Sequence, residues 1–109
     1  MTTGDILIAD LNPIVGSEQG GMRPVVVVSA PQYAVIPGLF LAVPLTSSNR
    51  ELRHHIEVPA NQQTGLERIS YAMTEQLRSL SYRRIKHQLG RIDGSTLHTI
   101  SRYLHLFIS

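Results

Sequence analysis

The first two thirds of the chain consist of short apolar runs, each closed by turn-forming residues. Within these runs apolar residues either alternate with polar ones or stand side by side, and neither pattern has the three- and four-residue spacing of a surface helix. The expected strands are Ile6–Ala9, Val25–Ser29, Leu39–Leu45, His55–Val58 and Ser70–Leu80. This pattern predicts a fold that is mainly β.

The run Val25–Val28 contains no polar residue, so both faces of this strand should be covered, as in the central strand of a small barrel. The preceding segment Asn12–Gly21 contains Pro13 and several glycines. Glycine tolerates positive φ angles, which suits a long loop. This loop could close over a ligand.

The period of the pattern changes near the end of the chain. After Asp93, Gly94 and Ser95, which supply an N-cap, apolar residues recur at spacings of three and four and predict an amphipathic helix. Its apolar face comprises Leu97, Ile100, Tyr103, Leu104 and Phe107. A shorter helical turn is expected over Tyr82–Ile85, after Ser81, and a last strand over Gln88–Ile92.

Composition limits the classes of protein to which the chain can belong. Its 109 residues, 42% of them hydrophobic, suit one globular domain over residues 1–109. Ten basic residues against eight acidic ones give a charge of only +2, and Lys86 is the single lysine. Arginine matches two phosphate oxygens, so the basic residues favour anion recognition. The absence of cysteine, of a leader and of an apolar span predicts a cytoplasmic protein without disulfides or a membrane anchor.

Four polar segments stand at the expected strand ends, where a rigid scaffold can direct side chains to one surface. They are Gly16–Gln19, Arg23-Pro24, Pro44–Ser47 and Glu75–Arg78. Pro24 stiffens the backbone that presents Arg23, although a surface arginine paired with a carboxylate is the plainer interpretation. Taken singly, none of these segments establishes a site.

Ordinary structural roles are open for the other polar residues of these segments. The hydroxyls of Ser17, Thr46 and Ser47 commonly bond to nearby backbone, and Glu18 suits a turn. Gln76 and Arg78 alternate around Leu77, so they should share one strand face, where an amide and a guanidinium could read a base edge and a phosphate.

The histidines do not form a predicted catalytic pair or a predicted metal site. His54 and His55 are adjacent in sequence and should point to opposite faces of a strand, so we expect them to flank a strand start without forming one site. His87, His98 and His105 lack the spacing of a metal site. No metal and no other cofactor is predicted.

Taken in chain order, the polar segments resemble the MazF/PemK family of toxin endoribonucleases from type II toxin-antitoxin systems. The similarity runs along almost the whole chain. The segments that carry it are Gly4-Asp5, Asp10–Pro13, Gly16–Gln19, Arg23–Ser29, Val43–Ser47, Gly65-Leu66, Ser70, Ala72, Glu75–Arg78 and the tail helix.

The resemblance implies a small SH3-like barrel of the MazF/CcdB toxin type, present as a homodimer and silenced by a cognate antitoxin. It implies sequence-selective cleavage of single-stranded RNA, most often messenger RNA. The catalytic pair maps onto Arg23 and Thr46. The surface that contacts RNA maps onto Ser17, Glu18, Gln19, Ser47, Gln76 and Arg78.

The chemistry expected for such a site does not need a metal. The RNA 2′-hydroxyl attacks the phosphorus and leaves a 2′,3′-cyclic phosphate and a 5′-hydroxyl. Arg23 would stabilise the negative charge of the phosphoryl oxygens, Thr46 would position the reactants, and Glu18 is the more sensible proton acceptor.

Two other functions remain open at this point. A barrel of the CcdB type poisons gyrase by binding, without nuclease activity, since one fold can host different functions. Small barrels also bind single strands without cutting them, although an aromatic content of 6% leaves little for a stacking platform. Arg23, Thr46 and Gln76 favour the nuclease.

Overall fold

The computed structural model describes residues 1–13, 15, 16, 20–30 and 37–108. The strands are β1 (Asp5–Asp10), β2 (Met22–Val27), β3 (Leu39–Thr46), β4 (His55–Val58), β5 (Ser70–Met73), β6 (Arg78–Ser81) and β7 (Ile85–Arg91). Two 3₁₀ turns, η2 (Thr74–Gln76) and η3 (Tyr82–Arg84), flank β6, and a single α-helix, α1 (Gly94–Ile108), ends the described part of the chain.

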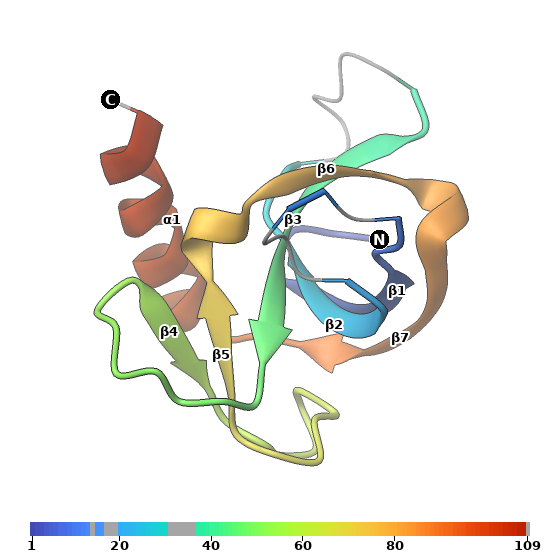
Figure 1. The fold of residues 1–109 in the computed structure, drawn as a ribbon. Helices are drawn as coiled ribbons and strands as arrows, with labels where there is room; N and C mark the ends of the chain where they lie inside the picture. The colour runs from blue at the N-terminus through green and yellow to red at the C-terminus, as the bar shows by residue number, and fades with distance from the viewer. Residues whose placement is uncertain (14, 17–19, 31–36, 109) are drawn as a thin grey trace.

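The strands form one antiparallel, seven-stranded sheet in the order β4-β5-β3-β2-β1-β7, with β6 also paired to β3. Figure 1 shows that β1, β2, β3, β6 and β7 curl around one another, whereas β4 and β5 lie beside α1. The predicted mainly β fold with a C-terminal helix is therefore confirmed. Among the described residues the pairing ends at β4 and β7, so the barrel is strongly curled but not closed.

The expected single strand Ser70–Leu80 is wrong, because η2 interrupts it and leaves β5 and β6 end to end along the same side of β3. Leu45 pairs with Ala72, whereas Ala42, three positions earlier, pairs with Arg78. Six residues on one strand therefore correspond to three on the other, and the three residues of η2 are left out of the pairing. The polar residues of this segment made a strand and a tight turn hard to distinguish.

The central strand β2 separates two apolar cores, as expected from its unbroken valine run. Val26 packs with Ile6 and Val43 in the core beneath α1. Val25 and Val27 pack into the core inside the curled sheet, with Leu7 among their neighbours. All three valines are fully buried. Alternating residues of one strand thus serve both cores, because successive side chains point to opposite faces.

Helix α1 begins where the change of period predicted. The carboxylate of Asp93 accepts a hydrogen bond from the backbone N–H of Thr96 (2.8 Å), and this bond lowers the pKa of the Asp93 carboxyl. Ile100 is fully buried, and Leu97 and Leu104 pack against the same core. The last turn is different, since Phe107 of the predicted apolar face is half exposed. Among the described residues no helix has the length and apolar character needed to cross a membrane.

The short turn η3 and the last strand also form, with shifted ends. The hydroxyl of Ser81 accepts a hydrogen bond from the backbone N–H of Arg83 (3.1 Å) at the start of η3. Strand β7 begins at Ile85, earlier than expected. Its pairing with β1 skips Leu89 and Lys86, so β7 carries two bulges, which bend it around the curled sheet.

Candidate active site

Arg23 lies beside the end of β3 that carries Thr46. Val25 of β2 pairs with Pro44 of β3, so continuing this register by two residues puts Arg23 opposite Thr46. The side chains agree with the register, because Nη1 of Arg23 donates to the backbone oxygen of Leu45 at 3.5 Å. The two residues that sequence analysis paired are therefore neighbours in the fold.

The two side chains differ in their freedom. The Arg23 guanidinium is half-buried, and its Nε donates to the backbone oxygen of Gly20 (3.0 Å). Thr46 is buried, with only 6% of its surface exposed, and its Oγ1 accepts a hydrogen bond from the backbone N–H of Ser48 (3.2 Å). Both groups are thus held in place by the backbone before any ligand arrives, which favours a preorganised site.

The sheet face that carries this pair extends onto the smaller strands. Thr46 pairs with Tyr71 of β5, and residues directly opposite each other share a face. Two positions further along β5, Met73 pairs with His55 of β4. The face therefore runs from Arg23 through Thr46 to His55, and the half-buried Tyr71 stands next to Thr46. The sequence did not predict Tyr71 as a site residue, because its cross-strand neighbour Thr46 is distant in the chain.

Two further arginines contact the backbone where β1 ends and the connection to β2 begins. Arg78 donates to the backbone oxygen of Leu11 (3.4 Å), and Arg84 donates to the backbone oxygens of Asp10 (3.0 Å) and Asn12. Arg23 holds the other end of this connection through Gly20. Arg84 was missed in the sequence because its contacts join residues more than seventy positions apart.

None of these three arginines forms an ion pair with a carboxylate within the described ranges of the chain. Among the described residues, the only arginine in an ion pair is Arg91, whose Nε lies 4.0 Å from Oδ1 of Asp5. Carbonyl oxygens carry only partial charge, so the positive charge of Arg23, Arg78 and Arg84 remains available to an anion. Phosphate is one anion whose oxygens match arginine donors well.

The remaining predicted site residues are spread over several elements. Ser47 is exposed just after β3. Gln76 ends η2 and Arg78 begins β6, so the expectation that they alternate along one strand is wrong. Both are half-buried. Ser17, Glu18 and Gln19 lie outside the described residues.

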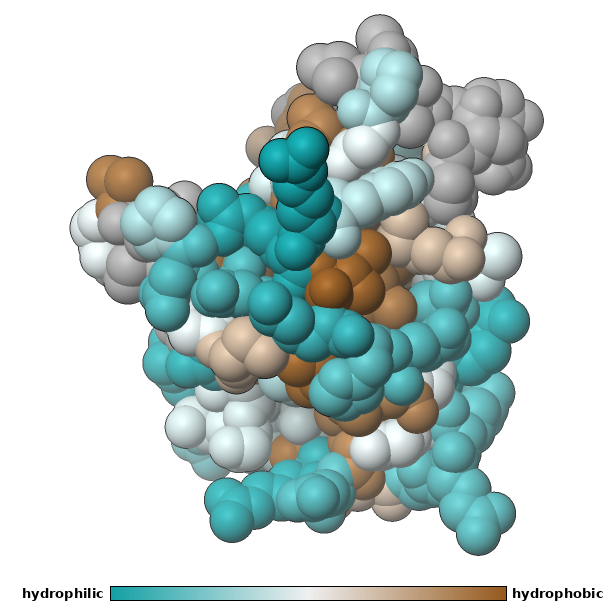
Figure 2. All heavy atoms as spheres, turned by 90° about the vertical axis from the view of Figure 1, so that its right-hand side faces the viewer, coloured by the Kyte–Doolittle hydropathy of each residue, from teal (hydrophilic) through white to brown (hydrophobic). Residues whose placement is uncertain are grey.

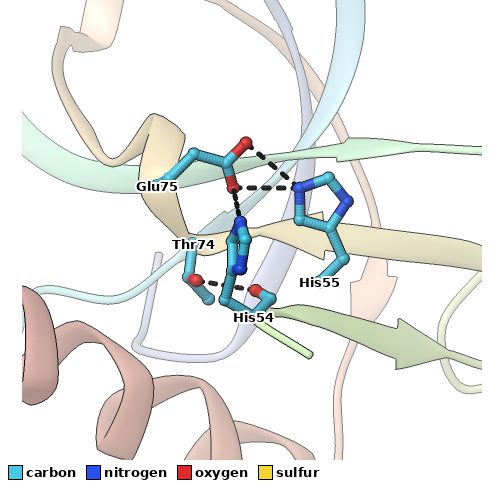
Figure 3. A network of polar contacts seen from close by, with 4 residues as sticks. All are labelled: His54, His55, Thr74 and Glu75. Atoms are coloured by element: carbon cyan, nitrogen blue, oxygen red, sulfur yellow. Dashed lines mark hydrogen bonds and ion pairs between the residues drawn. The ribbon is translucent and has the colours of Figure 1, made fainter. Parts of the chain in front are cut away.

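His54 and His55, which we expected not to serve one site, meet at Glu75. Nε2 of His55 lies 2.9 Å from Oε1 of Glu75, and Nε2 of His54 lies 3.4 Å from the same oxygen (Figure 3). The expectation failed because β4 begins only at His55, so His54 does not follow the strand alternation. Glu75 comes from η2, the turn that the sequence did not reveal.

A separate hollow of about 500 Å³ opens where β1, β2 and β7 meet the segment 65–70. Glu67, Arg68 and His87 supply its charged and titratable side chains. Figure 2 views the side of the molecule on which β7 lies, and shows a largely hydrophilic surface with a smaller apolar area near its centre. None of the residues predicted to act on a substrate lines this hollow, so it is not the candidate active site.

Comparison with known proteins agrees with the fold and identifies the family. The family model described as "PemK-like, MazF-like toxin of type II toxin-antitoxin system" matches residues 2–108. Endoribonuclease EndoA of Bacillus subtilis is 30% identical over 108 residues, which cover 97% of this chain and 92% of that protein.

Solved structures show the same similarity. The crystal structure of MazF (Form-I) from Deinococcus radiodurans superposes with a TM-score of 0.87 and 27% identity, covering 99% of this chain and 96% of that one. A MazE-MazF crystal structure (Form-II) from the same organism gives a TM-score of 0.78 at 27% identity, over 99% of this chain and 95% of that one.

The curled sheet with one C-terminal helix among the described residues defines a small, mainly β protein with the fold of the MazF structures. The chain belongs to the family of PemK-like, MazF-like toxins of type II toxin-antitoxin systems.

Proposed function

We propose that this toxin is an endoribonuclease that cuts single-stranded RNA, most often messenger RNA, at selected sequences without a metal ion. The observation that carries the proposal is the position of Arg23, half-buried beside Thr46 and without a carboxylate partner among the described residues. The endoribonuclease named among its relatives adds support.

In the proposed reaction the 2′-hydroxyl oxygen of the RNA forms a bond to phosphorus and the bond from phosphorus to the 5′ oxygen breaks. The products are a 2′,3′-cyclic phosphate and a 5′-hydroxyl, so DNA is not a substrate. A guanidinium has five N–H donors, and Arg23 gives two groups, Nε and Nη1, to the backbone. The N–H donors of Arg23 that do not bind the backbone can stabilise the negative charge that develops on the phosphoryl oxygens.

Thr46 acts in this proposal as a positioning group, because a neutral hydroxyl is a poor proton acceptor. We assign to Glu18 the role of general base, which accepts the proton of the attacking 2′-hydroxyl. Arg23 can donate a proton to the leaving 5′ oxygen. Ser17, Gln19, Ser47, Gln76 and Arg78 are proposed to contact the RNA around the scissile phosphate.

The partners follow from the family. A MazE-MazF complex is among the structures that this chain resembles, and we propose that a cognate antitoxin covers the Arg23 surface and blocks RNA. A homodimer and a site of action in the cytoplasm, where messenger RNA is found, belong to the same proposal.

The test is cleavage of a long single-stranded RNA in the presence of a chelator. Wild-type protein should cut it, and the fragments should accept a 5′ phosphate from a polynucleotide kinase directly, because their 5′ ends are hydroxyls. Replacing the ribose at a mapped cut with deoxyribose should block that cut.

Arg23→Ala should lower the cleavage rate at least about 10²- to 10³-fold while the far-ultraviolet circular dichroism stays unchanged. Arg102→Ala, on the exposed side of α1, is the matched control and should cut normally. A folded Arg23→Ala protein that retains wild-type activity would overturn the catalytic assignment, and intact RNA with the wild-type chain would overturn the nuclease itself.

A further inference from the structure

The only candidate group of metal ligands among the described residues lies outside the proposed catalytic pair. His54, His55 and Glu75 each offer one ligand atom, and the three atoms lie within 4.8 Å of one another. Thr46 pairs with Tyr71, and His55 pairs with Met73 one strand further out. Strand spacing and rise per residue therefore put His55 roughly 12 Å from Thr46 along the sheet.

We propose that His54, His55 and Glu75 bind a divalent transition metal ion of the zinc type. Two imidazoles and one carboxylate form a ligand set that zinc accepts, with a fourth position left to water, whereas magnesium and calcium prefer oxygen ligands.

The distances suit such an ion. Zinc bonds of ~2.0–2.2 Å in a tetrahedron separate neighbouring ligand atoms by about 3.4 Å. Oε1 of Glu75 lies 3.4 Å from Nε2 of His54 and 2.9 Å from Nε2 of His55. Figure 3 shows both imidazole rings directed at this carboxylate. Side-chain movements that bring the three ligand atoms from within 4.8 Å of one another to this spacing would admit the ion.

The charges suit it as well. The only ion pairs of Glu75 in the described part of the chain are with these two histidines. With neutral imidazoles the group carries one negative charge, which a divalent cation would neutralise. The side chains of His54 and Glu75 are 30% and 34% exposed, so the ion and its water can reach the group from solvent.

The group is held by several elements at once. Oγ1 of Thr74 donates to the backbone oxygen of His54 (2.6 Å) and ties η2 to the start of β4. The His55 side chain is almost fully buried. The ring of Phe107, near the end of α1, packs edge-on against the ring of His54 with centroids 5.8 Å apart. A bound ion would therefore join segments that meet only in the folded chain and would stabilise that state.

The metal-free molecule leaves one polar atom unsatisfied. Nδ1 of His55 is buried and has no hydrogen-bond partner among the described residues. An unpaired N–H costs more than an unpaired lone pair in such surroundings, so the proton belongs on Nε2, which donates to Glu75. An ion bound at Nε2 would take the place of that proton, and the neutral ring would then carry its proton on Nδ1, which has no acceptor among the described residues. This cost weakens binding, so we expect an exchangeable site rather than a permanently filled one.

The test is zinc binding to the full chain, purified without a histidine tag and stripped with a chelator. Calorimetric titration with zinc chloride should give one ion per chain, and the melting temperature should rise with zinc but not with magnesium. Cobalt(II) should develop the visible absorption of a tetrahedral complex with nitrogen and oxygen ligands.

Variants separate this site from adventitious binding. His54→Ala and Glu75→Gln should each weaken zinc binding at least about 10-fold and remove the rise in melting temperature. His98→Ala, an exposed histidine on α1, is the matched control and should bind as the wild type does. Equal binding by His54→Ala and wild type, or no binding by wild type, would overturn the proposal. RNA cleavage is not the readout, so the result is independent of the proposed nuclease.

Discussion

Arg23 combines a fixed position with unused hydrogen-bonding capacity. Its contacts with Gly20 and Leu45 are made to backbone oxygens at two different elements, so the guanidinium plane is set by the fold itself. Arg78 and Arg84 also donate to backbone oxygens, those of Leu11 and Asp10, just after β1 and at its end. In the proposed reaction, a phosphate bound at Arg23 would meet a donor whose orientation the fold has already set, which would reduce the reorganisation needed during catalysis.

Protonation of the Asp93 carboxylate should make the free energy of unfolding depend on pH. Its pKa is lower in the folded chain because the backbone N–H of Thr96 donates to the carboxylate. Such a carboxylate stabilises the folded chain above the pKa that it has when unfolded, and the contribution is lost as the pH falls through the folded value.

Asp93→Ala should therefore lower the urea midpoint at neutral pH, because it removes the helix cap. The loss should shrink in strong acid, where the wild-type carboxyl is protonated. Asp93→Asn, which keeps an oxygen acceptor but carries no charge, is the control and should lose less. An alanine variant as stable as the wild type at neutral pH would contradict this role.

The loop between β4 and β5 packs closely against β7. Thr64 is buried, and its Oγ1 donates to the backbone oxygen of Pro59 (2.7 Å), which stiffens the loop. The backbone N–H of Arg91 donates to the backbone oxygen of Gln63 (2.9 Å), so loop and strand are joined. Leu89 is one of the bulged residues of β7 at this contact. The close approach of two backbones leaves no room for side chains.

Glycine at positions 65 and 90 makes that approach possible. A Cβ on Gly90 would lie 2.2 Å from the backbone oxygen of Gln63, and one on Gly65 would lie 2.1 Å from that of Leu89. Gly90→Ala should lower the free energy of unfolding by about 1–3 kcal/mol, as overpacking does. Gly94→Ala is the control, since nothing lies within 4 Å of its added Cβ, and it should be neutral or slightly stabilising. Equal urea midpoints for Gly90→Ala and the wild type would show that position 90 does not need to be glycine for this close approach.

At the scale of the whole molecule, stability depends on two cores that share one layer of sheet. The inner core lies within the curl, and the other core is covered by α1. Because β2 contributes to both, loosening one core should affect the other, and the chain should unfold in a single transition.

Ile100 tests this arrangement, because it is the fully buried residue of α1. Ile100→Ala should reduce the free energy of unfolding by about 2–5 kcal/mol, through lost apolar burial and the cavity that remains. Arg102→Ala, at an exposed position two residues further along the same helix, is the control and should change the free energy of unfolding by less than about 0.5 kcal/mol. Two separate transitions in the Ile100→Ala protein would show that the cores are independent.

Local pattern was sufficient for most of the elements of this protein, the interrupted strand at residues 70–80 excepted. The alternation of apolar residues, the valine run of β2, the Ser81 and Asp93 caps and the change of period before α1 all depend on neighbours in sequence, and all of these elements form. The pairing of Arg23 with Thr46 came from the family resemblance, and the β2–β3 register agrees with it. Neighbouring residues therefore predicted most of the strands and the C-terminal helix, and the family resemblance predicted that Arg23 and Thr46 lie together.

The contacts between residues far apart in the chain could be located only in the folded molecule. The break at η2 inserts three residues into an expected strand, separates Gln76 from Arg78 and turns Glu75 toward His54 and His55. Arg84 reaches backbone oxygens more than seventy residues away. Such contacts depend on the register between strands distant in the chain, and a polar segment of this length satisfies strand and turn preferences equally well. Packing against β3 and α1 selects between them.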